Sequence, residues 1–204
     1  MTLDLAPEYQ EARNNKKERK NSSEDVSLYL ETYAEIKKVT TEAVSELKTN
    51  HPKYFSLLET VNDENEELAL DAAKVIGTLQ KKKPEIYALL MKAMLVERLS
   101  DLNKYIRDYT QSVLESEHHS KRLSTDFSTE TMTRQEEMDS YRSMKHDAMM
   151  DQLAIIIKQC KNLDIDIPWS NMVGYKEDKE YRAKIQAWAQ HIADYLAIVS
   201  ESTV

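Results

Sequence analysis

Apolar residues recur at steps of three and four positions along most of the chain, which is the period of an amphipathic helix. The clearest stretch predicts a central helix from about Thr131 to Leu163. No segment alternates as a half-buried strand does, and no repeat of about 20–50 residues is evident. The pattern therefore predicts an all-α protein. The second half of the central helix carries one apolar seam: Met149, Leu153, Ile156, Cys160 and Leu163.

The same period predicts further helices at about 22–49, 84–118 and 176–200. The stretch 52–82 keeps a heptad rhythm, but Asn62, Asp63 and Asn65 interrupt it. It is either one helix with Asn65 on its seam, as in register-setting coiled coils, or two helices with a break near 62. We favour the break. A helix of more than thirty residues is about 50 Å long, so the predicted fold class is an elongated bundle of about five helices.

Composition narrows the class of protein. Gly77 and Gly174 are the only glycines, too few for a phosphate-cradling loop or a dinucleotide-binding turn. The net charge of −8 disfavours general binding to nucleic acid or to an anionic membrane. The single cysteine excludes an internal disulfide, and there is neither a signal-peptide pattern nor an apolar run of about 20 residues. We therefore expect a cytoplasmic protein that does not span a membrane.

Residues 1–21 are polar and lack a hydrophobic period, so we expect a flexible or loosely helical N-terminal arm beside one helical-bundle domain at 22–204. Ser22 and Ser23 would cap the first helix of that domain. A basic arm can bind nucleic acid or an acidic partner, but a solvated tail is the interpretation we favour. The arm carries five basic residues: Arg13, Lys16, Lys17, Arg19 and Lys20.

Three ionisable residues continue the seam of the central helix backwards from Met149, and they are Asp139, Arg142 and His146. In the interpretation we favour, Arg142 and Asp139 form a buried pair that fixes helix register. Alternatively, this part of the helix overhangs the bundle, and the apolar stripe rotates onto Met138, Tyr141 and Met144. A third interpretation is a recognition pocket at one end of the bundle, where Arg142 binds an anion.

Other candidate chemistry is weak. Glu115-x-x-His118 has the spacing of a ferritin-like di-iron ligand pair, but the sequence contains no second such pair. A mononuclear site joining Asp139, His146 and His191 has no support from spacing. Cys160 lies on an apolar seam, where a small buried hydrophobe is expected rather than a thiolate. We predict no catalytic residue, no metal and no cofactor.

The stretch Arg142-Ser-Met-Lys-His146-Asp147-Ala-Met-Met-Asp-Gln-Leu153, followed by Ile167-Pro168-Trp169 and then by Tyr181-Arg182 leading into Trp188-Ala189, resembles part of a family of small, uncharacterised, all-helical bacterial proteins. In that family an Arg and then His-Asp or His-Asn open an apolar helix. The Asn-Arg that typically ends this helix is replaced here by Gln159-Cys160-Lys161-Asn162. The family has no known activity. The resemblance therefore implies a bacterial helical protein, and it marks Arg142, His146 and Asp147 as positions to test.

Together these features predict a non-enzymatic helical interaction or adaptor protein of the bacterial cytoplasm, which binds a protein partner or a second copy of itself. One alternative is a metal- or small-anion-dependent activity at Asp139, Arg142 and His146. A second alternative is a nucleic-acid-associated regulator that uses the basic arm.

Overall fold

The computed structural model describes residues 7–61, 65–125, 127–172 and 179–202, with the backbone alone for 7–19, 21, 170 and 171. Over these residues the protein is all-α, as the apolar period predicts, with seven α-helices, one 3-10 helix and no strand. The elements are α1 (Pro7–Asn50), α2 (Pro52–Val61), α3 (Glu66–Lys82), α4 (Pro84–Ala93), α5 (Leu95–Leu123), α6 (Thr129–Asn162), the 3-10 helix η1 (Pro168–Asn171) and α7 (Lys179–Glu201).

The first helix begins earlier than the sequence suggested. The predicted N-cap at Ser22 or Ser23 was wrong, because α1 runs unbroken from Pro7 to Asn50, and residues 7–21 therefore follow the helical alternative for the arm. Proline suits the first position of a helix, and the Lys, Arg and Glu residues that follow are good helix formers without burial. Residues 1–6 lie outside the described part. Of the basic run, only the Lys20 side chain is described, and it pairs with Glu24 at 3.7 Å.

The helix count differs from about five because two predicted helices are each divided. The stretch 52–82 forms α2 and α3, as favoured, and the Asn65 side chain caps α3 by accepting from the backbone N–H of Glu67 (3.1 Å) and Leu68 (3.4 Å). The stretch predicted as one helix from 84 to 118 instead breaks at Met94 and continues to Leu123.

Two hydrophobic cores share the long helix α1. The larger core lies between α1, α5, α6, η1 and α7, and the smaller one lies where the C-terminal part of α1 meets α2, α3 and α4. The seam predicted for the central helix is confirmed at Met149, Leu153, Ile156 and Cys160, which are buried, whereas Leu163 is partly buried. The same core contains the buried residues Leu99, Leu102 and Ile106 of α5. The break at Met94 falls where the chain passes from one core to the other, since Leu90 belongs to the smaller core and Leu95 to the larger.

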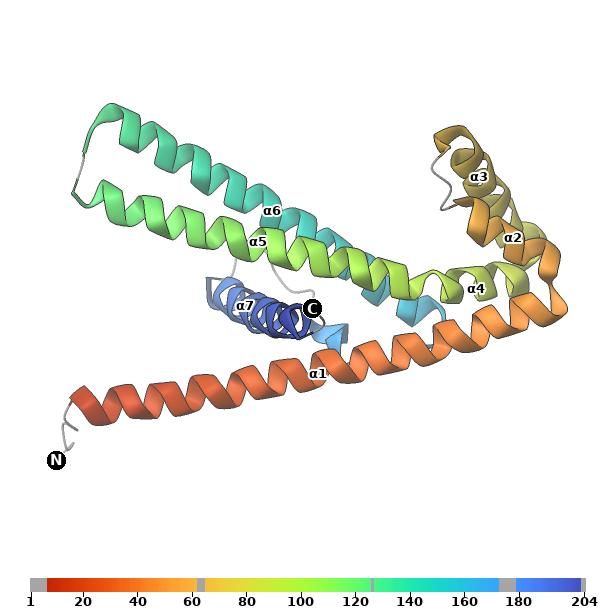
Figure 1. Ribbon diagram of the computed structural model, residues 1–204, viewed down its shortest axis with the longest axis horizontal. Helices are drawn as coiled ribbons and strands as arrows, with labels where there is room; N and C mark the ends of the chain where they lie inside the picture. Colours follow the sequence, from red (N-terminus) through yellow and green to blue (C-terminus); the bar gives the residue numbers. More distant parts are fainter. Residues whose placement is uncertain (1–6, 62–64, 126, 173–178, 203–204) are drawn as a thin grey trace.

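The helices form an elongated assembly (Figure 1). Helices α5 and α6 make a long antiparallel hairpin, and α7 lies between this hairpin and α1. Helices α2 and α3 project at the end where α1 finishes. Among the helices of the described residues, none is both long and apolar enough to cross a membrane.

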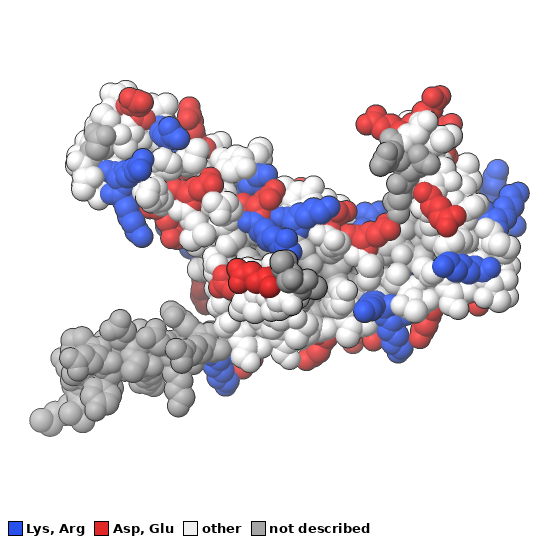
Figure 2. All heavy atoms as spheres, viewed as in Figure 1, with Lys and Arg blue, Asp and Glu red and all other residues white. Residues whose placement is uncertain are grey.

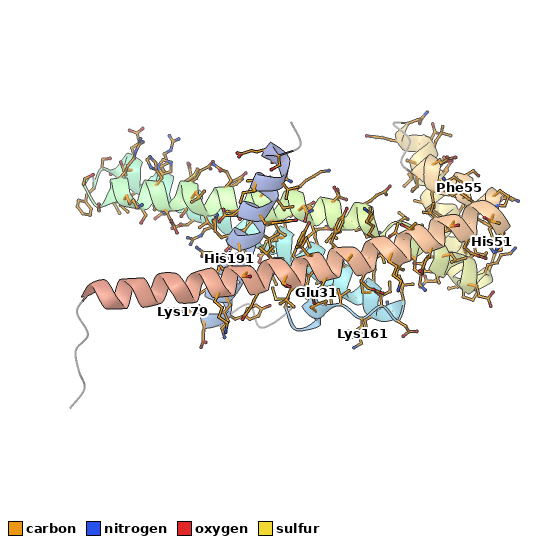
Figure 3. All side chains as sticks on the ribbon, turned by 60° about the horizontal axis from the view of Figure 1, so that its bottom comes forward. Glu31, His51, Phe55, Lys161, Lys179 and His191 are labelled. Carbon is orange, nitrogen blue, oxygen red and sulfur yellow. The ribbon has the colours of Figure 1, made fainter. Side chains whose placement is uncertain are left out.

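Helix α7 is held against α1 by aromatic packing and by one hydrogen bond. The ring of Trp169 in η1 is completely buried, 5.9 Å from the ring of Tyr29 in α1 and 5.5 Å from that of Trp188 in α7. His191 Nδ1 lies 2.6 Å from Asp25 Oδ2, and Figure 3 labels His191 where α7 crosses α1. These contacts fix where the first turns of α7 lie.

Candidate functional site

A hollow of about 410 Å³ opens where α5, α6 and α7 meet, and we call it the α6–α7 pocket. It brings together all four residues singled out from the sequence and adds two cations from the first turn of α7. Its lining is Tyr109 from α5; Asp139, Arg142, Ser143, His146 and Asp147 from α6; and Lys179, Arg182, Ala183 and Gln186 from α7.

The polar line of α6 forms one wall of this open pocket. The side chains of Asp139 and Arg142 are 47% and 41% exposed and 3.7 Å apart, so they are not the buried pair that we favoured. The apolar stripe has not rotated either, because Tyr141 and Met144 are 40% and 56% exposed. The helical spacing does place Asp139, Arg142 and His146 on one face. That face is opposite the polar residues of the first turn of α7, and not opposite an apolar helix surface.

Asp139 is a fixed carboxylate at one edge of the pocket. Its Oδ1 accepts hydrogen bonds from Ser116 Oγ (2.7 Å) and Gln135 Nε2 (3.1 Å), and it lies 3.7 Å from the guanidinium of Arg142. The Ser116 hydroxyl is the main cause of a lowered pKa of Asp139, and Gln135 and Arg142 add to it against the opposing effect of burial. Asp139 therefore stays ionised and holds Arg142 toward the pocket.

We predict a small, pH-dependent loss of stability in Asp139→Asn. A carboxyl group with a lowered pKa stabilises the fold above its unfolded pKa, and this contribution is lost as the pH falls through the folded pKa. Because the group is half exposed, the loss at neutral pH should be under about 1 kcal/mol. It should shrink in acid, as the pH falls below the ordinary value of 3.8 and through the lower pKa of the folded protein. Urea unfolding at neutral pH and at a series of acid pH values measures it, and a loss that stays unchanged down to the lowest pH would contradict the electrostatic cause.

Arg142 and Arg182 approach the same phenol. Tyr109 is 5% exposed, and burial raises its pKa while the positive charges of Arg142 and Arg182 act in the opposite direction. Two guanidinium groups from different helices are thus close enough to influence one oxygen. Since the pKa of Tyr109 is raised, its hydroxyl keeps its proton near neutral pH and remains a hydrogen-bond donor.

His146 belongs to the wall of the pocket. Its Nδ1 lies 3.3 Å from Asp147 Oδ1, and its ring meets the ring of Tyr109 edge to face at 5.4 Å. Its Nε2 is buried and has no hydrogen-bond partner among the described residues. A buried nitrogen does not face the open hollow, so His146 supports Tyr109 and does not present a ligand-binding atom.

Among the described residues, the lining of the pocket has more cations than carboxylates. Three cationic side chains, Arg142, Lys179 and Arg182, stand against the two carboxylates of Asp139 and Asp147, on a chain of net charge −8. Figure 2 shows acidic and basic side chains interspersed over the visible face, without an extended basic area. The arrangement suits one compact anion better than a long polyanion.

No known family model, curated protein or solved structure matches this chain. The resemblance to a bacterial helical family therefore stays a prediction, and the pocket itself has to support a functional proposal.

The structure does not assemble the weak metal candidates. Glu115 accepts a hydrogen bond from Gln111 Nε2 at 2.9 Å, and the rings of His118 and His119 lie against each other at 6.0 Å. His191 is bonded to Asp25 and is absent from the lining of the α6–α7 pocket. In the part of the chain that the structure describes, no group of three or more His, Cys, Asp or Glu residues is placed to hold a metal ion.

Cys160 is a core residue, as its place on the seam predicts. Its side chain is completely buried, and this burial raises the pKa of the thiol to about 11. A neutral, inaccessible thiol is neither a nucleophile nor a metal ligand.

Proposed function

We propose that this chain is a non-enzymatic helical interaction protein of the bacterial cytoplasm, and that it binds an acidic group of a protein partner in the α6–α7 pocket. The observation that supports this most strongly is the convergence of Arg142 and Arg182, from two helices, on one open hollow beside Tyr109. Arginine presents several N–H donors in a fixed plane, which suits the recognition of acidic groups.

The chemistry of the pocket favours binding over catalysis. An effective general base has a pKa near the working pH, whereas the pKa of Asp139 is lowered from its ordinary acidic value. The pKa of Tyr109 is raised, so its phenol is no base near neutral pH. The one thiol of the chain, that of Cys160, lies in the core, away from the pocket.

The α5–α6 hairpin offers apolar surface for the rest of a partner. Isolated exposed apolar side chains are ordinary in monomeric proteins, but several on one hairpin can contribute to an interface. Those on this hairpin that are at least 40% exposed are Leu114, Phe127, Met132, Tyr141 and Met144. They would add contact area around the charged group held in the pocket.

Partner capture from bacterial lysate tests the proposal. We expect the wild type to retain a protein that Arg142→Gln/Arg182→Gln loses. The matched control is Arg134→Gln/Lys184→Gln, which removes the same charge from the same two helices at exposed positions outside the pocket. The control should retain the partner. All variants should melt close to wild type, since exposed ion pairs contribute about 0–1 kcal/mol.

Two outcomes would count against this function. A partner that binds the pocket variant as well as wild type uses another surface. A partner lost equally from the pocket variant and the control responds to net charge alone. In either case the α6–α7 pocket is not where the partner binds.

A further inference from the structure

We infer that the group recognised in the α6–α7 pocket is a phosphate monoester dianion, carried either by a phosphorylated segment of the partner or by a small organic phosphate. This inference deepens the proposed function and rests on it for the place of binding.

The pocket has more cationic side chains than are needed to bind one carboxylate. One arginine can bind both oxygens of a carboxylate in a two-pronged contact. Here Arg142, Arg182 and Lys179 line the same hollow, so a ligand with three oxygens and two negative charges makes better use of them. A phosphate monoester carries about −1.5 to −2 charges near neutral pH. Arginine and lysine each bind phosphate, arginine through its planar set of donors and lysine as a point charge.

Asp139 positions the Arg142 side chain but does not use up its hydrogen-bond donors. The shortest contact between its guanidinium and Asp139 is 3.7 Å, longer than a hydrogen bond. Asp139 Oδ1 is itself held by Ser116 and Gln135. The carboxylate therefore directs the guanidinium into the pocket and leaves its N–H groups for a stronger acceptor. Such preparation of the free protein lowers the cost of ordering the side chain on binding.

Helix α7 supplies two of the three cations. Lys179, Arg182 and Ala183 of this helix all line the pocket. Figure 3 labels Lys179 near the start of α7.

The size of the hollow fits a phosphate together with the group that carries it. A water molecule occupies about 30 Å³ in the liquid, so a hollow of about 410 Å³ exceeds the needs of a bare phosphate. The space left over accommodates a side chain or the organic part of a small phosphate ester. Tyr109 and Ala183 supply apolar surface to this space.

Calorimetric titration of the full chain tests the inference, with phenyl phosphate as the probe and acetate as the carboxylate reference. We expect phenyl phosphate to bind at one site and acetate to bind at least about tenfold more weakly. Arg142→Gln and Arg182→Gln should each weaken phenyl phosphate about tenfold, because each removes charged hydrogen bonds. Arg134→Gln and Lys184→Gln, the matched controls, should change the affinity less than about twofold.

A titration with a third ligand distinguishes the two possible sources of the phosphate. If the phosphate belongs to a protein, a phosphoserine peptide should bind at least about tenfold more tightly than phenyl phosphate, whereas equal affinities assign the pocket to small organic phosphates. The inference is overturned if acetate binds as well as phenyl phosphate, or if the controls weaken binding as much as the pocket variants do.

Failure of this inference is distinguishable from failure of the proposed function. Suppose that partner capture depends on Arg142 and Arg182, but phenyl phosphate neither binds nor competes. The phosphate inference then fails and the interaction function stands. If phenyl phosphate binds through both arginines while partner capture is unchanged in their variants, the phosphate site stands and the proposed place of partner binding fails.

Discussion

Replacing Trp169 with alanine is expected to lower the free energy of unfolding by about 3–5 kcal/mol. The indole is completely buried and lies within 6 Å of two other aromatic rings, with centroid distances of 5.9 Å to Tyr29 and 5.5 Å to Trp188. Its removal leaves a cavity where η1 joins α1 to α7. Because three separate elements meet there, they cannot collapse to fill the space without losing other contacts.

Two further variants serve as controls, one at Trp169 itself and one at the exposed residue Phe127. Trp169→Phe should lose less than half as much stability, because an aromatic ring remains and the indole N–H has no hydrogen-bond partner in the described structure. Phe127→Ala, whose side chain is 76% exposed, should change stability by less than about 0.5 kcal/mol. Urea unfolding followed by circular dichroism measures all three. Equal stability of Trp169→Ala and Phe127→Ala would contradict the packing described for η1.

The Cys160 thiol is expected to react with iodoacetamide at least about a hundredfold more slowly in the folded chain than in the urea-unfolded chain. Burial raises the pKa of the thiol from its ordinary 9.0 to about 11. At a fixed pH below both values, that rise lowers the thiolate fraction about a hundredfold. The completely buried sulfur is shielded from the reagent as well.

The unfolded chain is the natural reference for this measurement, since Cys160 is the only cysteine. Alkylation followed by mass spectrometry gives both rates. A folded-state rate within about tenfold of the unfolded rate, on the scale that thiolate fraction sets, would mean that α6 does not bury Cys160 against α5. It would also reopen the question of a reactive thiol.

The apolar period predicted most of the fold because burial in a helical bundle follows it directly. Leu99, Leu102 and Ile106 of α5 are all completely buried, and so are Leu153 and Ile156 of α6. Spacing alone reports such faces. In α7, Ile185, Trp188 and Ile192 follow the same spacing and are buried, whereas Val199 near the end of the helix is 43% exposed.

Helix boundaries that depend on tertiary contacts could not be predicted from the apolar spacing. Nothing in the sequence around Met94 breaks a helix, and the interruption there coincides with the passage between two cores. The start of α1 was misjudged for a different reason. Residues 7–21 have no apolar stripe, so only helix propensity and Pro7 indicated a helix, and propensity is the weaker signal.

The sequence predicted the residues of the candidate site on α6 but not the way in which α7 completes it. Asp139, Arg142 and His146 were found because they occupy positions where the seam calls for apolar residues. Lys179 was not singled out and Arg182 was quoted only as part of the family resemblance, because both look like ordinary surface cations in the sequence. Their closeness to Arg142 depends on where the start of α7 is placed.

The placement of α7 links the fold to the proposed function. Trp188 and His191, in the middle of the helix, fix it against η1 and α1. The helix is rigid between these two residues and its first turn. The first turn is therefore held beside α6 even without a direct contact between the two helices at the pocket. The two guanidinium groups of Arg142 and Arg182 are thereby kept on one hollow.

The most direct test of this account is a nuclear magnetic resonance titration of the chain with phenyl phosphate, observing the side-chain Nε–H signals of its arginines. The sequence contains eight arginines, so the signals can be assigned by single substitutions. We predict that the signals of Arg142 and Arg182 shift together and saturate with one affinity, while those of Arg98, Arg107 and Arg134 stay in place. Small shifts spread over all arginines, or saturation at Arg142 without Arg182, would contradict a shared anion site in the α6–α7 pocket.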